Sequence, residues 1–90
     1  MTIQLFKIIT SRDEIVVGFS SEDLVNLGGT DAAAIGRKLV ADGSLGVWQY
    51  AVRRAADGSL EQAPLRQVAV LANDSLRIEP YSSPLPVAAA

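Results

Sequence analysis

The sequence predicts an α+β domain: a mostly antiparallel sheet of about five strands in the order β-β-α-α-β-β-β, with one or two helices packed on one face. Apolar and polar residues alternate near both ends of the chain, which is typical of half-buried strands. Between them, residues 20–43 carry apolar side chains at three-to-four-residue spacing, as amphipathic helices do. Ninety residues fit one compact domain, predicted over residues 1–80, and residues 81–90 are predicted to form a flexible Pro/Ala-rich tail.

Two segments at the start of the chain predict a β-hairpin. Residues 3–9 and 14–19 are rich in β-branched and aromatic side chains that favour strands. Ser11, Arg12 and Asp13 separate them and suit a turn. We therefore expect the two strands to pair with each other.

Two short helices are predicted after this hairpin. Ser20 or Ser21 is a typical N-cap for the first helix, and Gly28 is a typical residue to end it. Thr30 is the candidate N-cap of the second helix, and Gly43 lies just past its end. The second helix has one apolar stripe, so we expect it to cover one face of the sheet.

Residues 47–79 predict a three-stranded meander with turns at residues 57–58 and 73–74. The turns set the register, in which six pairs of residues lie opposite each other. The pairs are Arg54 with Glu61, Val52 with Ala63, Tyr50 with Leu65, Trp48 with Gln67, Leu71 with Leu76, and Ala69 with Ile78. Opposed residues share a face, which predicts a core face made of Trp48, Tyr50, Val52, Leu65, Ala69, Leu71, Leu76 and Ile78. Pro64 cannot donate to a ladder, so it marks either an edge or a bulge that shifts the register by one residue. The sheet can be open or can curl into a partial barrel.

The opposite face of the meander is the predicted interaction surface. Its partner-binding residues are Val47, Gln49, Arg53, Arg66, Val68, Val70 and Arg77. Valines ringed by guanidinium and amide groups are typical of an interface core with a polar rim. The sequence therefore predicts a non-catalytic protein-interaction module, either a self-associating subunit, expected as a homodimer, or a small accessory protein of a larger assembly. The alternative is a small anionic-ligand-binding domain that uses the three arginines.

The composition argues against several other classes. The chain has no histidine and no cysteine, so the commonest near-neutral acid/base and any thiolate are missing; we expect no enzyme, no cofactor and no metal site. A formal net charge of −2 without a basic block argues against a nucleic-acid or membrane partner. With neither a secretory signal nor an apolar run of about 20 residues, a cytoplasmic location is expected.

Two pairs of adjacent carboxylates are the only residues that suggest metal or acid/base chemistry. Asp13-Glu14 stands at a predicted turn and Glu22-Asp23 at a predicted helix start, where acidic residues are favoured for local reasons. An enzyme would need a cleft in which Asp13, Glu14 and Tyr81 converge.

Overall fold

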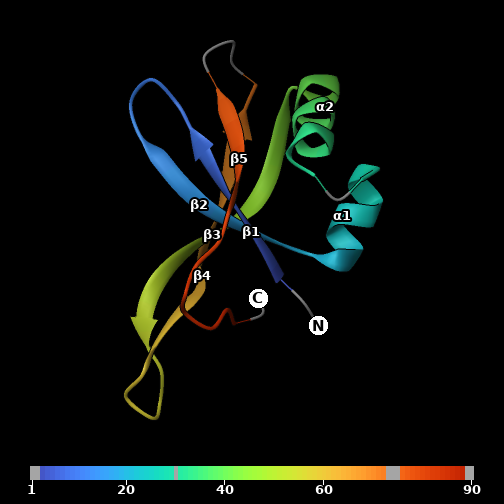
Figure 1. Ribbon diagram of the computed structural model, residues 1–90. Coiled ribbons are helices and arrows are strands. Elements are labelled where there is room, and N and C mark those ends of the chain that lie inside the picture. The colour runs from blue at the N-terminus through green and yellow to red at the C-terminus, as the bar shows by residue number, and fades with distance from the viewer. Residues whose placement is uncertain (1–2, 30, 73–75, 89–90) are drawn as a thin grey trace.

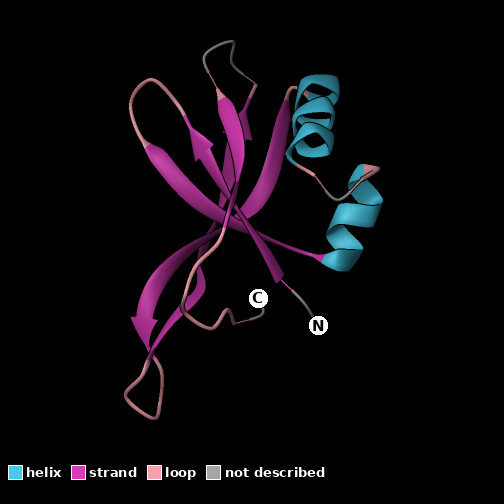
Figure 2. Cartoon of the chain, in the orientation of Figure 1, coloured by secondary structure: helices cyan, strands magenta, loops and turns pink. Residues whose placement is uncertain are grey.

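The structure is a computed structural model that describes residues 3–29, 31–72 and 76–88. One five-stranded antiparallel sheet and two helices confirm the predicted α+β class and element order (Figures 1 and 2). The strands are β1 (Ile3–Ile9), β2 (Glu14–Ser20), β3 (Ser44–Arg54), β4 (Leu60–Leu71) and β5 (Arg77–Tyr81), and the helices are α1 (Ser21–Leu27) and α2 (Ala32–Asp42).

The predicted N-terminal hairpin and the first helix start are confirmed. β1 pairs antiparallel with β2 along its whole length, from Ile3 opposite Ser20 to Ile9 opposite Glu14. Ser20 then caps α1: its side chain accepts from the backbone N–H of Asp23, whose carboxylate accepts from the backbone N–H of Ser20. This reciprocal capping box satisfies backbone donors that the first turn leaves unpaired.

Both helices end at glycines, as predicted. Gly28 and Gly43 have φ values of 93° and 78°, in the left-handed region that glycine adopts without a Cβ penalty. The cap predicted at Thr30 lies outside the described residues. The described N-cap of α2 is Asp31, whose carboxylate accepts from the Ala34 N–H at 2.9 Å.

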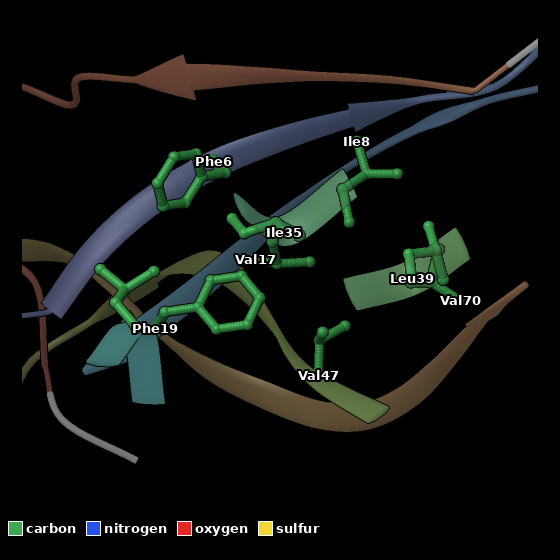
Figure 3. Packing of buried hydrophobic residues seen from close by; sticks show 9 residues of the cluster. Phe6, Ile8, Val17, Phe19, Ile35, Leu39, Val47 and Val70 are labelled. Carbon is green, nitrogen blue, oxygen red and sulfur yellow. The ribbon is translucent and has the colours of Figure 1, made fainter. Parts of the chain in front are cut away.

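The hydrophobic core lies between the sheet and the helices (Figure 3). Phe6 and Val17 come from β1 and β2, and Ile35 and Leu39 come from α2; all four are buried. The rings of Phe6 and Phe19 meet edge to face with their centroids 5.9 Å apart. Such ring pairs stabilise a core by more than their buried area alone.

The predicted pairing of β3 with β4 is wrong by one residue near the turn. Arg54 lies opposite Leu60, not opposite Glu61. The predicted two-residue turn would be of type I′, which needs a positive φ at both central residues. Of the two turn residues, Gly58 has a positive φ of 89° and Asp57 does not. The loop therefore takes an extra residue.

A bulge in β4 then restores the predicted register. Tyr50 lies opposite Pro64, whereas Trp48 lies opposite Gln67. Between these pairs β3 has one residue and β4 has two, Leu65 and Arg66, so the extra residue of β4 forms the bulge. Pro64 lacks an N–H, and a missing ladder bond is tolerated at a bulge. The expectation that Pro64 can mark a register-shifting bulge is confirmed.

The predicted assignment of the two β3–β4 faces is wrong. Val47 and Val70, expected outside, are buried in the core with 4 and 8 % exposure. Trp48, Val52 and Leu71, expected inside, expose 37, 52 and 68 %. The physical reason lies in the chain connection: one residue joins α2 to β3, so the helix folds back onto the face that carries Val47.

β5 does not complete a meander with β4. It pairs with β1, where Ile78 lies opposite Ile8, and the strand order is β4-β3-β2-β1-β5. The predicted pairs Leu71 with Leu76 and Ala69 with Ile78 are therefore wrong. Pairing with β1 places Ile78 beside the buried Ile8 and next to α2, so that its side chain packs against the hydrophobic core.

The two edge strands of the sheet follow each other in the chain. β4 ends at residue 71 and β5 begins at residue 77, yet they form opposite edges of the sheet. The turn predicted at residues 73–74 lies outside the described residues. Val68 and Val70 on one edge strand and Leu76, just before the other edge strand, line the same cleft.

Candidate functional site

Four of the seven predicted partner-binding residues lie at one cleft and three lie elsewhere. The cleft has a volume of about 750 Å³ and opens between the β1–β2 turn and the β3–β4 strands. Its lining includes Gln49, Arg66, Val68 and Val70. The other three are Val47, Arg53 and Arg77.

The three arginines that were expected on one face lie in three places. Arg53 forms an ion pair with Glu61 across the hairpin at 2.8 Å. Arg77 pairs with Glu79 at 2.6 Å on β5, at the other edge of the sheet. Of these three arginines, only Arg66 lines the cleft. A site that uses the three guanidinium groups together therefore has no geometric support.

The cleft combines an apolar floor with a polar mouth. Ile8, Val68 and Leu76 line it and belong to the core cluster or pack against it. At the mouth, Arg66 Nε donates to Gln49 Oε1 at 3.2 Å, across the paired strands. The hydrogen bond orients the guanidinium and uses only one of its five N–H donors.

Two acidic residues that line the cleft, Asp13 and Glu14, have partners close by in the chain. The Asp13 carboxylate accepts from the Thr10 hydroxyl at 3.0 Å, and Glu14 pairs with Lys7 at 3.6 Å. Tyr81 does not line the cleft and lies on β5, with Lys7 Nζ 5.0 Å from its ring centroid. Within residues 3–29, 31–72 and 76–88, no three carboxylate, histidine or cysteine side chains are close enough together to hold a metal ion.

The β3–β4 hairpin carries most of the exposed apolar side chains. β2 pairs with β3 only at residues 48–50, so the outer half of the hairpin extends beyond the rest of the sheet as a two-stranded ribbon (Figure 1). Of seven exposed large apolar residues in the described part of the chain, five belong to this hairpin: Trp48, Val52, Leu60, Leu65 and Leu71. The other two, Val25 and Val40, lie on the helices.

The C-terminal segment lies against β4, a contact that the sequence did not predict. The Gln62 N–H donates to the Pro86 carbonyl and the Ala88 N–H donates to the Gln62 carbonyl, both at 2.8 Å. Val87 thereby forms a parallel bridge with Gln62. The Tyr50 hydroxyl donates to the Ala88 carbonyl at 2.9 Å. The flexibility predicted for residues 81–90 and the domain bound at residue 80 stay predictions.

Tyr50 links this segment to the sheet. Only 3 % of the residue is exposed, and its ring lies directly over Gly18 of β2. Burial, and secondarily the charge of Asp23, raise the pKa of the Tyr50 hydroxyl above its usual range. The folded protein therefore favours the protonated hydroxyl, which is the form that can donate to Ala88.

Replacing Tyr50 with phenylalanine is expected to cost about 1 kcal/mol of stability near neutral pH, because the bond to Ala88 is lost. The raised pKa makes the contribution of Tyr50 to the free energy of unfolding depend on pH. The contribution is fully present below the ordinary tyrosine pKa, and it is lost as pH rises through the pKa that Tyr50 has in the folded protein. Urea unfolding from about pH 8 to about pH 11 measures it. The wild type should lose stability more steeply than Tyr50→Phe, and parallel curves would contradict this role.

No helix in the described part of the chain is long and apolar enough to cross a membrane. Comparisons with protein-family models, curated proteins and solved structures gave no match.

Proposed function

We propose that this chain is a non-catalytic protein-interaction module of the cytoplasm, either a self-associating subunit that forms a homodimer or a small accessory protein of a larger assembly. The observation that carries the proposal is the concentration of exposed apolar side chains on the β3–β4 hairpin. We call Trp48, Val52, Leu60 and Leu65 the hairpin patch; they expose 37, 52, 45 and 57 %.

The energetics of the hairpin favour a partner. Apart from the bridge between Gln62 and Val87, the outer half of the hairpin is a two-stranded ribbon. Such a ribbon alone is marginally stable in water, and cover on its apolar side chains stabilises it. Burying Val52, Leu60 or Leu65 contributes about 1–2 kcal/mol each before the cost of association is deducted. Trp48 adds a large amphipathic side chain of the type that often dominates binding energy.

The surroundings of the patch suit an interface rim. Arg54, which shares a face with Val52 and Leu60, donates to the Gly58 carbonyl, so a charged group borders the apolar side chains. In a homodimer the same patch of each copy would meet around a two-fold axis, which needs no second complementary surface.

The absence of histidine and cysteine from the sequence supports the non-catalytic reading, as does the local engagement of Asp13 and Glu14. The alternative, a small anionic-ligand-binding domain, is supported at Arg66 alone, because Arg53 and Arg77 are paired elsewhere.

Size-exclusion chromatography with light scattering tests self-association. We expect a mass that rises from monomer towards dimer with concentration, and a shift to monomer for Val52→Asp and for Leu65→Asp, because each places a charge in the patch. Val40→Asp is the matched control: Val40 exposes 76 % but lies on α2, outside the patch.

A wild type that stays monomeric at high micromolar concentration would remove the homodimer. The accessory role then remains testable by affinity capture with the wild type, Val52→Asp and Val40→Asp as parallel baits. A protein retained equally by all three would contradict binding through the hairpin patch.

A further inference from the structure

We propose that the cleft beside Arg66 binds small amphipathic carboxylates, which are molecules with one carboxylate on an apolar body. This site is separate from the hairpin patch, since none of the four patch residues lines the cleft. Either proposal can therefore fail without the other.

The floor of the cleft favours an apolar ligand body. Ile8, Ile15, Val68, Val70 and Leu76 all line it, and each belongs to the core cluster or packs against it. The apolar side chains come from β1, β2 and β4 and from the residue before β5. A hydrocarbon body in this cleft would continue the protein core and leave water, which is favourable by about 0.8 kcal/mol for each buried CH₂ group.

The mouth of the cleft favours a negative charge. Arg66 on β4 and Arg12 in the β1–β2 turn both line it. Among the described residues neither guanidinium has a carboxylate within ion-pair distance. Asp13 and Glu14 line the cleft as well: Asp13 accepts a hydrogen bond from the Thr10 hydroxyl, and the charge of Glu14 is paired with Lys7.

The geometry of Arg66 favours a carboxylate in particular. Its Nε is hydrogen-bonded to Gln49 Oε1, which restrains the planar group, and the residue lines the cleft. A guanidinium presents parallel N–H donors that match the two oxygens of a carboxylate. The volume of about 750 Å³ falls within the range of small-molecule sites, roughly 300–1,000 Å³.

Titration with a series of straight-chain carboxylates, followed by calorimetry and by methyl NMR, tests the site. Acetate should not bind, and affinity should rise severalfold from hexanoate to octanoate to decanoate as more CH₂ groups enter the floor. Shifts should appear at the methyl groups of Ile8, Ile15 and Val68. Octylamine, with the same apolar body and the opposite charge, should bind at least about tenfold more weakly than octanoate.

Two arginine variants identify the anion site. Arg66→Gln should weaken octanoate binding by about tenfold or more. Arg53→Gln is the matched control, because Arg53 lies on the adjoining strand, pairs with Glu61 and does not line the cleft. Octanoate affinity should be unchanged in it. Thermal unfolding of both variants without ligand checks that each is folded.

Three results would overturn the proposal. The first is no octanoate binding at millimolar concentration, and the second is equal binding of octanoate and octylamine. The third is equal weakening in Arg66→Gln and Arg53→Gln, which would mean that the protein's overall charge and not the cleft attracts the anion.

Discussion

Val47→Asp is expected to leave little folded protein, whereas Val52→Asp, five residues further along the same strand, is expected to stay folded. Val47 is 4 % exposed and belongs to the core beneath α2, while Val52 is 52 % exposed on the other face of β3. A carboxylate at position 47 would be buried among the apolar side chains of the core, at a cost of several kcal/mol. That is a large part of the total stability of a domain, about 5–15 kcal/mol.

Circular dichroism with urea titration of the two variants measures this difference. The comparison is matched in chemistry, since both changes replace a strand valine with aspartate. If the predicted faces had been right, Val47→Asp would be the mild variant and Val52→Asp the one that unfolds. Equal stability of the two variants would contradict the placement of α2 over the Val47 face.

Local signals account for what the sequence predicted correctly. The Ser20 cap, the glycines that end both helices and the β1–β2 hairpin each depend on a few neighbouring residues. The element order follows from those signals in turn. The bulge near Pro64 could be predicted for the same reason, because proline lacks the backbone N–H of a strand ladder whichever strand it pairs with.

Non-local geometry accounts for what the sequence did not predict. The face of β3 that is buried depends on where α2 folds back, and alternation alone assigns two faces without saying which one a helix covers. Large side chains such as Trp48 and Tyr50 suggested the core, yet Trp48 is partly exposed and Tyr50 is covered from the other side by residues 86–88. The pairing of β5 with β1 joins residues about 70 positions apart, which no local pattern specifies.

The candidate sites show the same division. Arg66 and Gln49 were predicted as neighbours, and their hydrogen bond follows from a register that the bulge restores. The grouping of Arg77 with them depended on a β4–β5 pairing that does not form. The hairpin patch consists largely of residues that were assigned to the core, so the expectation of an interaction surface stays a prediction while its location changes.

Gly18→Val is expected to destabilise the protein, although valine is the better strand former. Gly18 lies in the middle of β2, where β propensity alone favours the substitution by up to about 1 kcal/mol. A Cβ at this position, however, would lie 2.8 Å from Cδ1 and from Cζ of the Tyr50 ring. That ring is buried and its hydroxyl is bonded to Ala88, so it cannot swing away freely. We expect a net loss of about 2–3 kcal/mol or more from overpacking.

Gly46→Val on β3 is the control that separates sterics from propensity. A Cβ on Gly46 meets no atom within 4 Å, so the same substitution should be neutral or stabilising there. Adding Tyr50→Ala to Gly18→Val should then cost less than Tyr50→Ala costs alone, because the new methyl groups occupy space that the ring has left. Chemical denaturation of the wild type, Gly18→Val, Tyr50→Ala and the double variant completes the cycle, with Gly46→Val measured beside them. Strictly additive losses of stability would mean that Gly18 and Tyr50 do not touch. That result would contradict the position of the Tyr50 ring, and with it the path of the C-terminal segment over Tyr50.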